Sequence, residues 1–125
     1  MINLILTLAF LLPIQAQANE ERCLAKIIFA ESRGESIEGA VAVGQAAVNR
    51  AKRTGKTICM LTGIARSTPP RNLMAHYTAL AKSVITGKDS IVRNSDSWNA
   101  GTKPRCAGEV VRNIGGHVFY VMSDL

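Results

Sequence analysis

The pattern of apolar and polar positions predicts a first helix over residues 19–32. Three apolar side chains recur at the i, i+3, i+4 spacing of a core-facing helix stripe, namely Leu24, Ile27 and Ile28. Asn19 is a suitable N-cap, and Gly34 is a suitable helix stop. The next position of the stripe is Glu31, where burial would favour the protonated form that a general acid needs. A last turn that points outward would instead leave this carboxylate in solvent.

The same periodicity predicts further helices. Ser36 is a suitable N-cap for a second helix that extends to about Arg53. One face of this helix has small residues that allow close packing against another helix, at Ala40, Gly44 and Ala47. A short helix is expected over residues 57–65, and a longer one over residues 72–86.

Helical periodicity fades after Gly87. Residues 89–108 are rich in Ser, Asn, Asp and Gly, which is typical of a long loop, and they contain the single tryptophan, Trp98. Residues 115–122 form a short β-prone segment. The expected fold class is therefore mainly α (α+β), as a small single domain with a long loop and a short C-terminal β segment.

Residues 1–18 have the pattern of a secretory signal peptide. An apolar run over residues 4–12 is followed by Ala16-Gln17-Ala18, an A-x-A cleavage signature. The segment has no Lys or Arg before the apolar run, so a retained membrane anchor and a buried core helix are alternatives, although a spanning helix needs about 20 apolar residues. We expect export to the periplasm, the cell envelope or the medium, membrane contact only in transit, and a catalytic domain over residues 19–125.

The charge of the chain suggests an anionic partner. The 125 residues have a formal net charge of +6, and all charged side chains lie after residue 18. Nucleic acid, anionic lipid and a bacterial envelope polymer are the partner classes that such a surface attracts. The basic residues are spread along the chain without interleaved aromatic residues, which, together with export, argues against nucleic acid. We expect a monomer.

Three cysteines follow the predicted cleavage site: Cys23, Cys59 and Cys106. In an oxidising compartment, two of them can form a disulfide and one is left over, and the sequence leaves the pairing open. No two cysteines have CxxC spacing, and the two histidines are isolated in the sequence, so we expect no zinc site.

Three blocks of the sequence together resemble a known family. The first is Phe29-Ala30-Glu31-Ser32-Arg33-Gly34-Glu35, continued by residues 38–43 and by Val48-Asn49-Arg50. The others are Asp96-Ser97-Trp98-Asn99 and Gly116-His117-Val118-Phe119-Tyr120. From about residue 22 to residue 122, the chain resembles the spore cortex-lytic (SleB-type) cell wall hydrolases. Members of that family also occur in phages, so an endolysin-like phage or prophage protein is part of this hypothesis.

The resemblance implies a lysozyme-like fold that cuts the glycan strand of peptidoglycan between N-acetylmuramic acid and N-acetylglucosamine. It implies that Glu31 is the general acid, and it implies no cofactor or metal. Members that are lytic transglycosylases need no second carboxylate, because the 6-hydroxyl of muramic acid attacks and an anhydro sugar forms. A true hydrolase needs a second carboxylate about 5 to 9.5 Å away, for which Glu35 and Asp96 are the candidates.

Four residues of the later blocks are candidates for substrate binding: Ser97, Trp98, His117 and Tyr120. The two aromatic residues could stack on sugar rings or anchor the core, and His117 could bind substrate or be a core histidine. For Asn49 and Arg50, at the end of the second helix, we expect capping or helix–helix hydrogen bonding.

Two other function classes stay open at this level. Cys23 near a helix N-terminus and His117 far downstream could form a Cys–His peptidase or amidase that acts on the peptide part of the wall. A basic exported module could also bind an envelope polymer without cleaving it. Substitution of Glu31 separates these classes, because only glycan cleavage requires its carboxylate.

Overall fold

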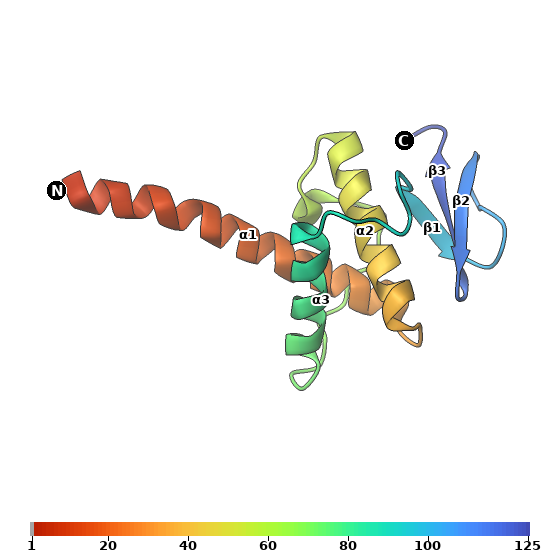
Figure 1. Ribbon diagram of the computed structural model, residues 1–125, viewed down its shortest axis with the longest axis horizontal. Coiled ribbons are helices and arrows are strands. Elements are labelled where there is room, and N and C mark those ends of the chain that lie inside the picture. Colours follow the sequence, from red (N-terminus) through yellow and green to blue (C-terminus); the bar gives the residue numbers. More distant parts are fainter. Residues whose placement is uncertain (1) are drawn as a thin grey trace.

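Three helices and a small antiparallel sheet make up the protein. The computed structural model describes residues 2–125, with side chains from residue 13 onward. The elements in chain order are α1 (Ile2–Ser32), α2 (Ile37–Thr54), the 3₁₀ turn η1 (Ile58–Met60), α3 (Met74–Thr86), β1 (Ser97–Ala100), β2 (Gly108–Ile114) and β3 (His117–Met122). The C-terminal half of α1 packs with α2 and α3, and the sheet lies beyond α2, whereas the N-terminal half of α1 projects away (Figure 1). The expected α+β class is confirmed.

Helix α1 does not begin at Asn19. It continues through that residue from Ile2, so the predicted N-cap is wrong, whereas the predicted end at Ser32 is correct. Side chains 13–19 are exposed, and burial begins around residue 20. Cleavage after residue 18 stays a prediction, and the first twelve side chains of the proposed leader lie outside the described part. Among the described residues, no helix has the length and apolar character needed to cross a membrane.

The core lies where α1, α2 and α3 meet. Leu24, Ile27 and Ile28 are fully buried, as the helical stripe predicts. A Cβ atom at Gly44 of α2 would lie only 3.0 Å from Ile28 Cδ1 and 3.1 Å from Val84 Cγ2, so glycine at this position allows the three helices to approach one another. Ser36 is the N-cap of α2 and accepts a hydrogen bond from the Gly39 amide, as expected.

The sheet has the strand order β1-β3-β2, with antiparallel pairing throughout. Two of its strands were missed by the sequence pattern: β1 lies inside the expected loop over residues 89–108, and β2 was not expected at all. Strand β1 has only four residues, and β2 is an edge strand whose residues are almost all solvent-exposed. The buried positions of β1 are the polar residues Ser97 and Asn99, so neither strand has the alternation of apolar and polar residues that identifies a strand in a sequence.

The predicted helix over residues 57–65 is also wrong in extent. Only Ile58–Met60 form a single 3₁₀ turn, and the chain then continues without regular structure to Leu73. Gly63 has φ +73°, a left-handed conformation that ends any helical continuation. Helix α3 begins at Met74, slightly later than expected, and ends at the predicted Gly87.

A polar stripe on α2 fixes the loop that leads to the sheet. The amides of Gln45 and Asn49 donate to the carbonyl oxygens of Asp89 (3.1 Å), Arg93 (2.7 Å) and Ser95 (2.9 Å). One helical turn farther on, Arg53 donates to the carboxylate of Asp96. Residues at i, i+4 and i+8 of one helix thus bind the loop over residues 89–96.

Asp96 is a buried part of this attachment, with 1% of its surface exposed. Its Oδ1 atom accepts hydrogen bonds from Ser97 Oγ (2.9 Å) and from the Met122 amide (3.0 Å), and its Oδ2 atom accepts one from Arg53. Arg53 also donates to the Met122 carbonyl oxygen at 2.7 Å. The carboxylate therefore joins α2, the start of β1 and the end of β3.

We predict that Asp96→Asn lowers the free energy of unfolding by about 1–3 kcal/mol. The Asp96 carboxylate accepts hydrogen bonds from three donors, one of which is the charged Arg53, and the substitution removes its negative charge. Urea denaturation monitored by circular dichroism measures the effect. Asp89→Asn is the matched control, since Asp89 lies in the same loop with an exposed side chain. Equal stability of the two variants would contradict an anchoring role for Asp96.

The pairing of the cysteines is resolved by the fold. Cys23 of α1 forms a disulfide with Cys59 of η1, across a sequence separation of 36 residues, and Cys106 is free and exposed. With its sulfur in this bond, Cys23 offers no thiolate as a nucleophile. The Cys–His peptidase alternative therefore loses its nucleophile.

We predict that the double substitution Cys23→Ser/Cys59→Ser lowers the free energy of unfolding by about 2–4 kcal/mol, because the disulfide restricts the unfolded chain. Urea titration of the oxidised protein and of the variant provides the comparison. Cys106→Ser leaves the disulfide intact and should unfold at the same urea concentration as the parent. A double variant as stable as the parent would show that this bond adds no stability.

Candidate functional site

Glu31 lies in the last turn of α1, at the predicted continuation of the buried stripe. Its side chain is half-buried. The Oε1 atom accepts a hydrogen bond from the Ala65 amide at 3.0 Å, and the Oε2 atom accepts one from Trp98 Nε1 at 3.2 Å. One donor comes from the segment after η1 and the other from β1, so the carboxylate is held between two parts of the chain that are far apart in sequence.

A small open pocket of about 70 Å³ surrounds this carboxylate. Its lining residues come from α1, α2, the segment after η1 and β1, and they are Glu31, Arg50, Gly63, Ile64 and Trp98. A carboxyl group, a guanidinium group and an indole thus border one cavity, and Ile64 adds an apolar wall. This combination offers a proton-transferring group, a cation and a flat apolar surface, which suit a ligand with hydroxyl groups and ring faces.

The register of the sheet aims Trp98 at Glu31. Trp98 of β1 is opposite Phe119 of β3, and Ala100 is opposite His117. Because directly opposed residues share a face, Trp98, Phe119 and His117 lie on one face of the sheet. Phe119 on this face is fully buried in the helical core. The same face therefore packs on the helices and presents the indole to the end of α1.

Glu35 lies close to the start of β3, at His117 of the same sheet face. Its Oε1 atom is 3.2 Å from His117 Nδ1, and its Oε2 atom accepts a hydrogen bond from the Gly116 amide at 3.3 Å. A Cβ atom at Gly116 would lie 2.8 Å from Glu35 Oε1, so glycine there lets the β2–β3 turn lie against the carboxylate without displacing the end of its side chain. The predicted candidates Glu35 and His117 are thus neighbours, but neither lines the pocket of Glu31.

His117 Nδ1 is buried and, although close to Glu35, has no hydrogen bond of good geometry among the described residues. This contact brings the Glu35 carboxylate within 3.2 Å of the imidazole nitrogen. It joins the turn between α1 and α2 to the start of β3.

The other candidate carboxylate, Asp96, and its neighbour Ser97 belong to the buried network with Arg53. Both side chains are 1% exposed, and they are hydrogen-bonded to each other. Neither residue lines the pocket of Glu31. The hydrogen-bond partners of Asp96 are those of a structural anchor.

Tyr120 lies on the opposite face of the sheet from Trp98, since it is paired with Ser97. It is 2% exposed. Burial raises the pKa of its phenol above the usual value, and contact with the Cys106 thiol raises the pKa further.

Asn99 binds Lys103 and Arg105 through their backbone atoms and so holds the loop after β1 on this side of the sheet.

The sequence interpretation missed two contributors to the pocket. Arg50 was expected to have a capping or packing role, yet it lines the cavity beside Glu31, and its place in the Val48-Asn49-Arg50 block was the available signal. The segment Gly63-Ile64-Ala65 had no such signal, because its position follows from the disulfide and the irregular chain after η1. Among the described residues, no group of three or more His, Cys, Asp or Glu side chains is arranged to hold a metal ion.

Comparison with known proteins gives the fold a precedent. No protein-family model and no curated protein sequence matches the chain. Two solved structures are similar to it, each with a TM-score of 0.62 and 19% identity over 82% of this chain. One is the catalytic domain of the germination-specific lytic transglycosylase SleB from Bacillus anthracis, 93% of which is covered, and the other is the catalytic domain of the Bacillus cereus SleB protein, 89% of which is covered. The chain therefore has the fold of SleB catalytic domains.

Proposed function

We propose that this protein cleaves the glycan strand of bacterial peptidoglycan, with Glu31 as the general acid. The observation that carries the proposal is the position of the Glu31 carboxylate, held by Trp98 and the Ala65 amide at the edge of a pocket. The fold shared with a domain described as a lytic transglycosylase supports the same reaction class. The net charge of +6 would favour binding to an anionic wall polymer.

The proposed reaction is lytic transglycosylation. Protonated Glu31 donates its proton to the glycosidic oxygen, so the bond between muramic acid C1 and that oxygen breaks and the N-acetylglucosamine end leaves as an alcohol. The resulting carboxylate then takes the proton of the muramic acid 6-hydroxyl, while the oxygen of that hydroxyl forms a bond to C1. The product is a 1,6-anhydro sugar, water is not consumed, and Glu31 regains its proton.

This reaction fits the pocket because Glu31 is the sole carboxylate among the residues that line it. A retaining hydrolase would need a nucleophilic carboxylate about 5 Å away, and an inverting one would need a base about 6.5–9.5 Å away. Glu35 and Asp96 are instead engaged by His117, Gly116 and Arg53. We assign Trp98 to stacking on a sugar ring and Arg50 to hydrogen bonding with substrate oxygens.

Location in the cell envelope is part of this proposal. The disulfide between Cys23 and Cys59 supports it, because such bonds persist in oxidising compartments. The A-x-A signature before Asn19 supports export, and the exposure of side chains 13–19 means that cleavage there would remove no buried contact from the described part of the leader.

We predict that Glu31→Gln abolishes release of muropeptides from purified peptidoglycan and leaves the fold intact, because the amide can neither donate nor take up the transferred proton. The rate loss should be at least about 100-fold, as is typical when a general acid is removed. Turbidity loss of a peptidoglycan suspension and mass spectrometry of the soluble products measure it. Glu38→Gln is the control, since this exposed glutamate of α2 forms an ion pair with exposed Arg112 and neither residue lines the pocket of Glu31.

We further predict that the products end in 1,6-anhydro-muramic acid, because the muramic acid itself supplies the nucleophile. Mass spectrometry distinguishes this end from a reducing end by the mass of one water. Reducing ends would mean hydrolysis, and loss of activity in Glu35→Gln or Asp96→Asn would then identify the second carboxylate. Intact glycan with cleaved peptides would contradict the role of Glu31, and binding without any cleavage would indicate a non-enzymatic module.

A further inference from the structure

The Ala65 amide reaches Glu31 from a segment that has no regular secondary structure. Residues 61–66 lie between η1 and the Pro69-Pro70 pair, and two of them, Gly63 and Ile64, line the pocket. Ordering a backbone residue costs about 1–2 kcal/mol, whereas one partly exposed hydrogen bond contributes only about 0.5–1.5 kcal/mol. The bond from Ala65 to Glu31 therefore cannot by itself keep this segment in place.

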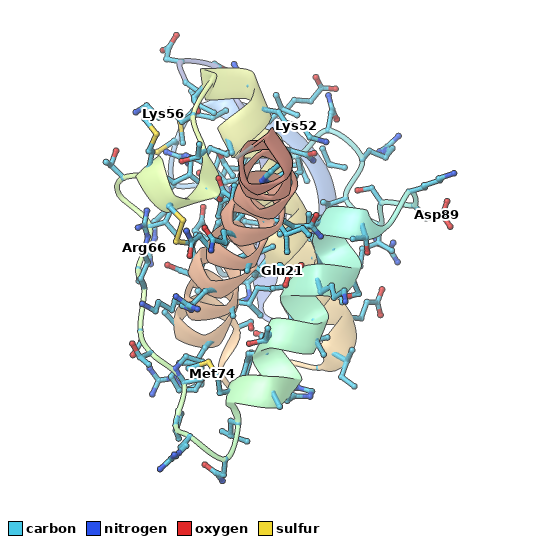
Figure 2. The ribbon with its side chains drawn as sticks, turned by 90° about the vertical axis from the view of Figure 1, so that its left-hand side faces the viewer. Glu21, Lys52, Lys56, Arg66, Met74 and Asp89 are labelled. Atoms are coloured by element: carbon cyan, nitrogen blue, oxygen red, sulfur yellow. A yellow bond between two sulfur atoms is a disulfide. The ribbon has the colours of Figure 1, made fainter. Side chains whose placement is uncertain are left out.

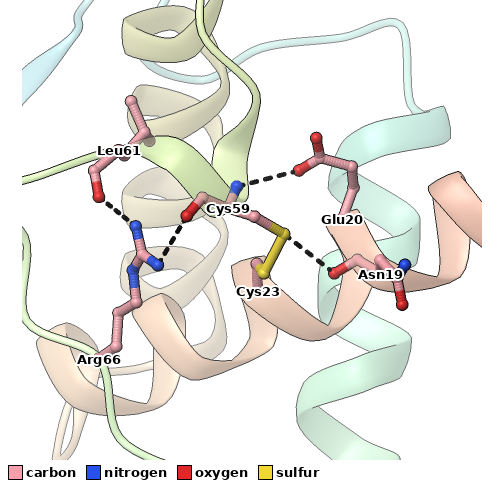
Figure 3. Close-up of a disulfide and its surroundings, with 6 residues drawn as sticks. All are labelled: Asn19, Glu20, Cys23, Cys59, Leu61 and Arg66. Atoms are coloured by element: carbon pink, nitrogen blue, oxygen red, sulfur yellow. Dashed lines mark hydrogen bonds between the residues drawn. A yellow bond between two sulfur atoms is a disulfide. The ribbon is translucent and has the colours of Figure 1, made fainter.

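Arg66 provides a second attachment for the segment. Its Nη1 atom donates to the Cys59 carbonyl oxygen at 2.9 Å, and its Nη2 atom donates to the Leu61 carbonyl oxygen (Figure 3). The guanidinium thus binds the middle residue of η1 and the residue that follows η1. Because the fork of donors is planar and rigid, the two carbonyl groups are held in one fixed relation.

The 3₁₀ turn η1 is itself fixed to α1, the helix that carries Glu31. The disulfide joins Cys59 to Cys23, about two helical turns before Glu31. Beside it, the Cys59 amide donates to Glu20 Oε2 at 3.2 Å, and beyond the pocket the Ser67 amide donates to the Lys26 carbonyl oxygen at 3.2 Å. Figure 2, which looks along α1, shows Arg66 on the side opposite the loop with Asp89. Among the described residues, the hydrogen bonds from this segment to a helix go to α1, although η1 also packs against α2.

We propose that Arg66 and the Cys23–Cys59 disulfide form a brace that positions the Gly63–Ala65 segment against Glu31, which makes Arg66 a positioning residue for the proposed cleavage. The inference rests on the proposed function of Glu31. Arg66 itself does not line the pocket. It acts by keeping the Ala65 amide and the Ile64 wall where the carboxylate and a bound sugar meet them.

The first test replaces Arg66 by Gln and by Lys. Arg66→Gln removes both charged donors, and we expect kcat to fall about 10- to 100-fold with KM changed by less than about threefold, because misplacement near the reacting group affects the rate of the chemical step. Arg66→Lys keeps one donor at a time and should restore part of the rate. Arg71→Gln is the matched control, since Arg71 is an exposed arginine of the same connection.

A second readout does not depend on activity. Trp98 is the single tryptophan, and it borders the same pocket as Gly63 and Ile64, so its fluorescence reports whether the segment is in place. We expect acrylamide to quench Trp98 more strongly in Arg66→Gln than in the parent and in Arg71→Gln, with the circular dichroism spectrum unchanged.

Reduction of the disulfide should act in the same direction. A phosphine reductant transfers two electrons to the two sulfurs, which become thiols by taking two protons, while the phosphine is oxidised to its oxide with oxygen from water. At a temperature where the reduced protein is still folded, we expect higher acrylamide quenching and a lower kcat, and the double Cys23→Ser/Cys59→Ser variant should behave like the reduced parent.

The outcomes separate this inference from the proposed function. If the parent cleaves glycan but Arg66→Gln keeps the parental kcat and quenching, the brace is refuted while the function of Glu31 stands. If the disulfide variant loses stability only, with kcat and quenching unchanged in the folded state, the bond stabilises the fold without positioning the segment, and the inference fails. If the parent cleaves no glycan, the proposed function fails, and the quenching of Arg66→Gln still decides for or against the brace.

Discussion

The buried carboxylate of Asp96 is the constraint on which the rest of the structure depends. It joins the C-terminal turn of α2 to the start of β1 and the end of β3, which lie at the same end of this antiparallel pair, through Arg53, Ser97 and the Met122 amide. Pairing between strands tolerates no slip here, because a shift by one residue would turn Trp98 to the opposite face of the sheet. A charge that has no contact with the pocket thus determines which side chain of β1 reaches Glu31.

The two walls of the pocket are held by different kinds of force. On the sheet side, buried hydrogen bonds and strand register place Trp98, and the core residue Phe119 packs on the same face. On the other side, a disulfide and the two hydrogen bonds of Arg66 support a segment without regular structure. Glu31 lies between them on the most regular element, the end of a helix that is anchored in the core. A small domain can therefore build a defined site without a large core of its own.

The sequence predicted the helices whose apolar residues repeat with a helical period. It failed where the position of a strand or side chain depends on contacts between residues distant in the sequence. The stripe of Leu24, Ile27 and Ile28 correctly placed the C-terminal part of α1 and the carboxylate that follows the stripe, and the small face of α2 correctly predicted close helix packing. The exposed edge strand β2 has no alternation to detect. The pocket position of Arg50 depends on the approach of α1 and β1, which no local pattern of α2 encodes.

The three candidate carboxylates show why residue type and spacing do not by themselves identify a catalytic group. All three are partly or fully buried, and each has hydrogen-bond donors or cations nearby. What differs is the geometry of those partners. Asp96 is enclosed by donors on both oxygens, including a guanidinium, and Glu35 is covered by the glycine turn and His117. Glu31 also has one donor on each oxygen, but its carboxylate borders an open cavity, so a ligand oxygen can approach it without displacing the fold.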